Sequence, residues 1–288
     1  MFVVNGGGIY LEISASNYGQ QARGISPAGA ADQLAFNTAH ILLGKPENYR
    51  CLEIIYPPKQ IVFTEEVIFC LTGSGFPHTE LTNNGKSQIL NHAQNYRAQA
   101  GDILTLNGAR QGLRSYLMMS NWNSQSPQYL NLARGSFQRY FTPYSNTLYV
   151  TQGPELDYLL YPEQFLTKAW EIDSKSNAMG TRLIGNPCEL RSYDIISAPV
   201  ADGVIQFTSG GPIVLMRQRQ TIGGYPRCLV VTQPSLNHLA QIQFRQQVKF
   251  KLISHEQAQQ NLQEYLEQLK TFRQNILQIT HNNIDKPN

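Results

Sequence analysis

Residues 217–226 read Arg217-Gln218-Arg219-Gln220-Thr221-Ile222-Gly223-Gly224-Tyr225-Pro226. Short apolar runs at 212–216 and 229–231 flank this stretch, and such runs predict two buried strands joined by a loop. The adjacent glycines permit positive φ angles and let a ligand approach the backbone closely. Arg217 and Arg219 offer fork-shaped donors for a carboxylate or a phosphate. The loop therefore either holds an anion or a carbonyl group, or is a tight turn with a solvated basic rim.

The rest of the chain repeats the pattern of short apolar runs bounded by Gly, Pro, Asn or Asp. Asn84-Gly85 is a good hairpin turn, because this pair readily adopts the positive φ angles of a type I′ turn. Many strands and few helices predict a mainly β fold, either barrels or sandwiches. The runs that carry this prediction are 52–55, 61–63, 67–71, 103–106, 116–119, 148–150, 204–207, 213–216, 229–231 and 248–253.

Two segments instead have helical spacing of their apolar residues. Residues 32–43 form one, with Gly44 placed as its C-terminal stop. The other runs from Ser254 to about residue 279 and begins with a capping-box pattern, Ser254 with Gln257. It carries one apolar stripe, which predicts packing on a barrel or on a partner protein. The stripe consists of Ala258, Leu262, Tyr265, Leu266, Leu269, Phe272 and Ile276.

Composition limits the classes of partner. The 288 residues have 41% hydrophobic and 15% charged content and a net charge of +3, which argues against nucleic acid or an anionic membrane as the main partner. The four cysteines form no C-x-x-C pair and the histidines do not cluster with them, so we expect free thiols and no metal site. The N-terminus has no signal-peptide pattern, and we expect a cytoplasmic protein.

Most catalytic signatures are absent from the sequence, including the phosphate loop, the nucleophile elbow and the zinc motif of metalloproteases. Ser74 is either a nucleophile without an identifiable base or part of a turn. Three loops remain as candidates: residues 24–32, which are rich in Gly and enter a helix, residues 174–183, and residues 217–226. Free backbone N–H groups at the start of a helix can bind an anion, although Asp32 at the cap would compete for them.

The order of these three loops resembles the carboxyltransferase-domain family. This family includes the C-type subunit of 5-oxoprolinase, the second subunit of allophanate hydrolase-like proteins, the antagonist of the sporulation kinase inhibitor KipI and the carboxyltransferase part of urea carboxylase. Residues 24–32 resemble its G-V-x-x-S-G-A-M-D segment, and 176–183 resemble S-x-R-M-G-x-R-L. Residues 218–226 resemble D-R-Q-T-T-G-G-Y-P, the most specific piece. The resemblance covers roughly residues 10–255.

The resemblance implies two linked cyclophilin-like β-barrel subdomains with few helices. We expect the first at residues 1–125, the second at 126–254, and a C-terminal helix with a disordered tail after His281 at 255–288. It also implies a B-type companion subunit, and in 5-oxoprolinase an A-type subunit as well. The implied activity is the ATP-dependent opening of 5-oxoproline to glutamate, with ATP used by the complex; oligomers are also compatible.

Several positions depart from the family pattern. Gln218 stands where the family has aspartate, Ala178 where it has arginine, and Ala198 where a glutamate is expected. Three interpretations therefore stay open: an amide hydrolase subunit, a catalytically degenerate binding or regulatory subunit, and a biotin-dependent carboxyltransferase. The chain has no biotinyl-lysine motif, so biotin would come from elsewhere and is disfavoured.

A cyclic amide needs its carbonyl polarised and its developing oxyanion stabilised, and arginine and backbone N–H groups supply both. We therefore expect the loop at 217–226 to act on a small-molecule substrate. The expected catalytic residues are Arg219, Gln220, Thr221 and Tyr225, and the expected substrate-binding residues are Gly223, Gly224, Gly29, Asp32, Ser176 and Asn177.

Overall fold

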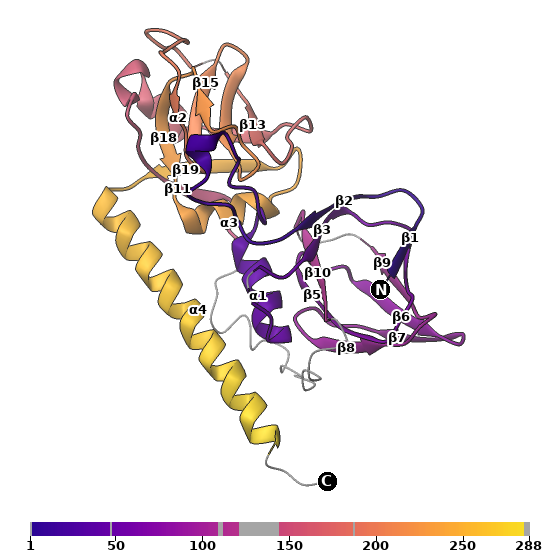
Figure 1. Cartoon of the computed structure of the whole chain (residues 1–288). Coiled ribbons are helices and arrows are strands. Elements are labelled where there is room, and N and C mark those ends of the chain that lie inside the picture. Colours follow the sequence, from indigo (N-terminus) through magenta and orange to yellow (C-terminus); the bar gives the residue numbers. More distant parts are fainter. Residues whose placement is uncertain (1, 47, 109–111, 121–143, 187, 285–288) are drawn as a thin grey trace. The chain divides into compact units, whose positions relative to one another are not determined.

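The computed structural model describes residues 2–46, 48–108, 112–120, 144–186 and 188–284 (Figure 1). Strands predominate in this described part, which confirms the expected mainly β fold. The chain divides into two compact units, and each is described by itself. The two-sheet unit comprises Met1–Ala15, Asp32–Pro143 and Glu267–Asn288, and the barrel unit comprises Ser16–Ala31 and Tyr144–Leu266. The expected boundary at 125/126 lies outside the described residues.

The two-sheet unit contains two antiparallel five-stranded sheets, in the orders β1-β4-β9-β6-β7 and β2-β3-β10-β5-β8. Buried side chains from both sheets form one apolar core. The predicted hairpin turn joins β6 to β7, with Asn83 paired to Lys86 and positive φ at Asn84 and Gly85. The strands are β1 Phe2–Asn5, β2 Ile9–Ile13, β3 Cys51–Tyr56, β4 Gln60–Phe63, β5 Val67–Gly73, β6 His78–Asn83, β7 Lys86–Ile89, β8 Asn95–Ala98, β9 Ile103–Asn107 and β10 Ser115–Met119.

Helix α1, Gln33–Leu43, belongs to the same unit and has the predicted ends. The Asp32 carboxylate accepts a hydrogen bond from Ala35 N at 3.1 Å, and Gly44 ends the helix in the left-handed conformation. The helix packs against β5 and β10, where Thr72 Oγ1 donates to Ala35 O at 2.7 Å.

The barrel unit is a closed seven-stranded barrel in the order β11-β18-β15-β16-β13-β12-β19. The β11–β19 pair is parallel and the other pairs are antiparallel. Phe165, Trp170, Phe207 and Phe250 pack in its core with ring centroids about 5 Å apart. The strands are β11 Thr147–Gln152, β12 Ala169–Ile172, β13 Gly180–Ile184, β15 Val204–Thr208, β16 Gly211–Leu215, β18 Arg227–Val231 and β19 Gln247–Leu252.

Several short elements of this unit lie outside the barrel strands. A separate two-stranded ribbon pairs β14, Ala198–Pro199, with β17, Ile222–Gly223. Strand β17 belongs to the loop at 217–226, so backbone pairing with β14 holds this part of the loop. The remaining elements are the helices α2 Pro162–Thr167 and α3 Gln233–Gln241, and the 3₁₀ turns η1 Gln21–Arg23 and η2 Leu156–Tyr158.

The C-terminal helix α4 spans His255–Ile284. Ser254 Oγ accepts a hydrogen bond from Gln257 N at 3.1 Å, as the capping pattern predicts. Of the apolar stripe, Phe272 and Ile276 are buried, while Leu266 is 52% exposed. Helix α4 extends past His281, where we expected a disordered tail to begin. Residues 285–288 lie outside the described part. None of the described helices is both long and apolar enough to span a membrane.

Candidate functional site

The three loops selected from the sequence meet through backbone contacts in the barrel unit. Arg217 O accepts hydrogen bonds from Ala28 N at 2.9 Å and from Ser26 Oγ at 3.1 Å. On the other side, Gln218 N donates to Ala178 O at 3.2 Å. Residues far apart in the chain are thus joined at one place, and the loop at 217–226 lies between the other two.

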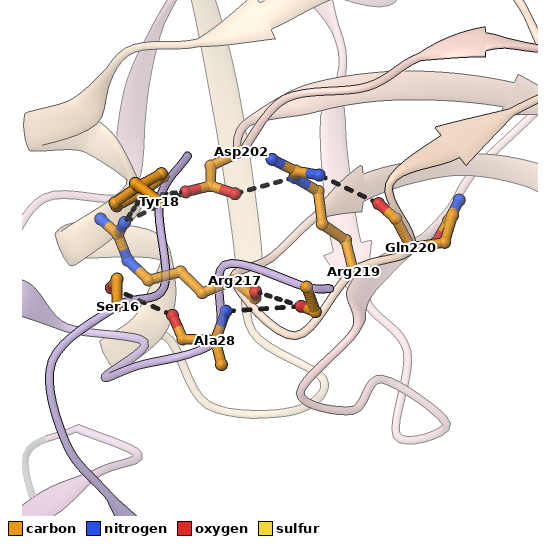
Figure 2. A network of polar contacts seen from close by, with 8 residues as sticks. Ser16, Tyr18, Ala28, Asp202, Arg217, Arg219 and Gln220 are labelled. Atoms are coloured by element: carbon orange, nitrogen blue, oxygen red, sulfur yellow. Dashed lines mark hydrogen bonds and ion pairs between the residues drawn. The ribbon is translucent and has the colours of Figure 1, made fainter. Parts of the chain in front are cut away.

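Asp202 links the two arginines of the loop (Figure 2). Its Oδ2 lies 3.1 Å from Arg217 Nη1, and its Oδ1 lies 2.8 Å from Arg219 Nε. All three side chains are buried, with 3%, 3% and 8% of the Arg217, Arg219 and Asp202 side chains exposed. Two guanidinium groups and one carboxylate leave a net charge of +1 in this cluster.

Tyr18 completes the cluster (Figure 2). Its hydroxyl donates to Asp202 Oδ2 and accepts from Arg217 Nη1 at 2.5 Å. Burial of the hydroxyl raises the Tyr18 pKa to about 12, the nearby Arg217 opposes that rise, and Asp202 adds to it. The phenol is therefore neutral at physiological pH and contributes no charge.

The cluster retains hydrogen-bond donors without acceptors. Arg217 Nε and Nη2, and Gln206 Nε2, are buried and have no hydrogen-bond partner among the residues that the structure describes. Buried donors are nearly always satisfied in proteins, and leaving them unpaired costs free energy. Together with the net charge of +1, these donors favour a bound anion or carbonyl oxygen.

A chain of polar contacts connects the arginines to Gln206. Arg219 Nη1 donates to Gln220 O at 2.9 Å, and Gln220 Nε2 donates to Gln206 Oε1 at 3.2 Å. A Cβ atom at Gly223 would lie 2.4 Å from Gln206 Nε2, so a larger residue there would push the end of the Gln206 side chain away from β17.

Sequence comparison identifies the family of this site. The carboxyltransferase domain, subdomains A and B, matches residues 23–133 and 124–252. The chain belongs to this carboxyltransferase-domain family. Residues 24–32, 174–183 and 217–226 all lie in the matched ranges, so the cluster is built from segments that the family match covers.

Curated relatives and a solved structure are similar to this chain over most of its length. The chain is 29% identical to the C-type subunit of 5-oxoprolinase from Escherichia coli (strain K12), over 91% of this chain and 95% of that protein. It is 26% identical to the C-type subunit of 5-oxoprolinase from Haemophilus influenzae, over 84% and 87% of the two chains. The Kluyveromyces lactis urea carboxylase structure shares the fold, with a TM-score of 0.79 at 20% identity. The matched region covers 94% of this chain and 29% of that protein.

The structure brings together only some of the residues expected to act in this carboxyltransferase domain. Arg219 and Gln220 belong to the cluster, and Gly223 adjoins it through Gln206. The backbone carbonyls of Thr221 and Gly224 accept hydrogen bonds from Val200 N and Ile195 N. The Tyr225 side chain is 42% exposed. The catalytic roles of these residues stay predictions.

The expected substrate-binding residues outside this loop have local structural contacts. Gly29 has a φ of +84°, and a Cβ there would lie 2.4 Å from Ser16 Oγ, which fixes the turn after Ala28. Ser176 Oγ accepts from Arg182 N at 2.9 Å, and Asn177 Oδ1 accepts from Met179 N at 2.9 Å, so both order their own loop.

Asp32 belongs to the two-sheet unit, where its carboxylate caps α1. In the same unit Ser74 N donates to Arg114 O at 2.7 Å, and Ser74 O accepts from Ser115 Oγ at 2.6 Å. Both residues are thus held within backbone structure of that unit.

Sequence reasoning missed Asp202, Tyr18 and the orphaned donor of Gln206. Asp202 lies in the turn directly before β15. The pair Asp202-Gly203 is a turn signal in the sequence, but the arginine partners of Asp202 could not be read from spacing. Tyr18 gave no sequence signal, because its partner Asp202 is 184 positions away.

Two cavities lie elsewhere. One of about 230 Å³ in the barrel unit is lined in part by Asp173, Arg182 and Tyr193. The other, of about 400 Å³, lies in the two-sheet unit beside Arg50 and Cys51. Neither is lined by the arginine cluster, so we treat the cluster as a separate site.

Proposed function

We propose that this chain is the C-type component of an ATP-dependent 5-oxoprolinase complex and acts with a B-type subunit, and with an A-type subunit where one is present. One observation carries the proposal: Arg219 of the most specific family piece belongs to a buried Arg217–Asp202–Arg219 cluster with a net positive charge and unused donors. The match to the C-type subunit of Escherichia coli 5-oxoprolinase over nearly the whole of both chains supports it.

The chemistry of the substrate suits this site. 5-Oxoproline carries a carboxylate and a ring amide, so it presents both an anion and a carbonyl acceptor. Opening the ring builds negative charge on the amide oxygen, and preorganised donors in a water-poor site stabilise such charge. The cluster supplies that kind of donor and holds its arginines in place before the substrate arrives.

We assign ATP to the complex rather than to this cluster. The net charge of +1 on the Arg217–Asp202–Arg219 cluster is too small to balance a triphosphate, and the sequence has no phosphate loop. The chain has no biotinyl-lysine motif, so a biotin-dependent reaction would need biotin carried by another chain.

The test is reconstitution. The chain is co-expressed with its companion subunits, and ATP hydrolysis dependent on 5-oxoproline is measured. We expect turnover that falls sharply in Arg219→Ala, because that change removes one of the two arginine partners of Asp202 and the bond to Gln220 O. The matched control is Arg191→Ala, since Arg191 pairs with Asp157 on the exposed surface of the same unit. Absence of turnover with every companion combination would refute the proposal.

A second candidate function is a catalytically degenerate binding or regulatory subunit of the same family. Gln218 and Ala178, which replace charged residues of the family pattern, are direct neighbours through a backbone hydrogen bond of 3.2 Å. This function predicts a stable complex whose activity survives Arg219→Ala. A large loss of activity with the complex intact counts against it.

A further inference from the structure

The unused edge of Arg217 has the shape of a carboxylate-binding fork. Nη1 is occupied by Tyr18 and Asp202, whereas Nε and Nη2 are both buried without an acceptor in the described part of the chain. In the planar guanidinium group, Nε and Nη2 donate in parallel along one edge. Two parallel N–H donors match the two oxygens of a carboxylate, which is the geometry of bidentate recognition.

Asp202 cannot fill this fork. Its Oδ2 already accepts from Arg217 Nη1 and from the Tyr18 hydroxyl, and its Oδ1 accepts from Arg219 Nε. The neutral Tyr18 phenol adds no negative charge either. The cluster therefore lacks one negative charge and one two-oxygen acceptor, which a single carboxylate group supplies together.

The fork is also held in place from the backbone side. Arg217 O accepts from Ala28 N and Ser26 Oγ, and Gly29 fixes the turn that presents them. At the other end of the side chain, Tyr18 and Asp202 fix the guanidinium plane. A donor pair ordered before the ligand arrives loses less entropy on binding, so its contribution to affinity is larger.

We propose that the Nε–Nη2 edge of Arg217 binds the carboxylate of a small monoanion, and that this contact restricts the substrate to amides that carry a carboxylate. A neutral urea or an unsubstituted lactam lacks the group that fills the fork. The inference rests on the proposed function for its choice of an amide substrate, but the fork itself is a feature of the chain alone.

The test compares two ligands with the same ring. Isothermal titration calorimetry on the full chain, and on its complex with companion subunits, uses 5-oxoproline and 2-pyrrolidinone, which lacks the carboxylate. We expect 5-oxoproline to bind more tightly by on the order of tenfold or more. Arg217→Lys keeps the charge but removes the fork, and it should abolish most of this preference.

Two controls distinguish a loss of carboxylate binding at the fork from a loss of folding. Arg227→Lys is the matched variant, because Arg227 in the same unit already uses its Nε and Nη2 edge to bind Glu155. Circular dichroism checks that both variants fold. If Arg217→Lys does not fold, the ligand comparison on the unmodified chain still decides, together with the shift of the Arg217 Nε–H resonance on titration with 5-oxoproline.

The inference is overturned if the two ligands bind equally, if a folded Arg217→Lys chain keeps the preference, or if 5-oxoproline binds neither the chain nor the complex. Its failure is distinguishable from failure of the proposed function. Carboxylate binding through the fork without ATP hydrolysis refutes the oxoprolinase proposal alone. ATP hydrolysis that depends on 5-oxoproline but not on Arg217 refutes the fork alone.

Discussion

Replacing Asp202 with asparagine removes the one negative charge that the two buried arginines share. The substitution keeps the size of the side chain and one carbonyl acceptor, so the packing of the turn before β15 should change little. Arg217 and Arg219, both with 3% of the side chain exposed, then keep their charges without a counter-charge. The variant therefore isolates the electrostatic part of the cluster.

The expected cost is about 3 to 5 kcal/mol in the free energy of unfolding, the range for removing one partner from a buried ion pair. Two unit charges about 4 Å apart interact by about 4 kcal/mol at an effective dielectric constant of about 20, which agrees in size. At about 2 to 4 °C per kcal/mol for a chain of this length, the melting temperature should fall by about 6 to 20 °C.

The assay follows urea unfolding of the barrel unit by tryptophan fluorescence. Trp170 is 1% exposed in the barrel core, and the chain has one other tryptophan, Trp122. A Trp122→Phe background therefore makes the signal report on the barrel unit. Asp157→Asn is the matched control, because the Asp157–Arg191 pair is more than 60% exposed on both sides and should cost below about 1 kcal/mol. A folded Asp202→Asn chain within about 1 kcal/mol of the unmodified chain would refute the reasoning.

Three further perturbations test other parts of the structure. Gly223→Ala should cost about 1 kcal/mol in the same unfolding assay, because its Cβ would lie 2.4 Å from Gln206 Nε2 and the buried Gln206 side chain would have to move; an unchanged stability would show that this side chain moves away without cost. Burial lowers the His92 pKa from 6.5 to about 4, so stability present above pH 6.5 should fall by about 3 kcal/mol as pH drops toward 4. His92→Gln should flatten that pH profile and His78→Gln, at an exposed position, should not. The Tyr18 pKa is raised from 10 to about 12, so its contribution to stability is complete below pH 10 and lost as pH rises through 12; Tyr18→Phe should remove that alkaline component from pH-dependent unfolding curves.

Local features of the fold were predictable from the sequence. The Asp32 cap, the Gly44 stop and the Asn84-Gly85 turn each depend on a few neighbouring residues, and all three formed as expected. The apolar stripe predicted helix α4, but it did not predict which residues of the stripe are buried, because periodicity alone does not say what packs on a face. Only part of that stripe is buried.

The site was predictable only as a set of loops. Arg219 could be selected because glycines and flanking strands mark its loop, but its ion pair with Asp202 depends on how strands β15 and β16 bring two turns together. Tyr18 reaches Asp202 across 184 positions. Contacts of this kind arise from tertiary packing between segments far apart in the chain, and one sequence carries no periodic signal for them.

Two of the three departures from the family pattern offset one another in charge. The family arginine at position 178 and aspartate at position 218 carry opposite charges, and the backbone bond between Ala178 and Gln218 places these positions side by side. Losing both removes one positive and one negative charge at the same place, so the net charge there is unchanged. The Arg217–Asp202–Arg219 cluster keeps its net charge of +1 and its unused fork. Carboxylate binding is therefore expected under both candidate functions, and only the activity of the Arg219→Ala complex distinguishes a catalytic subunit from a binding one.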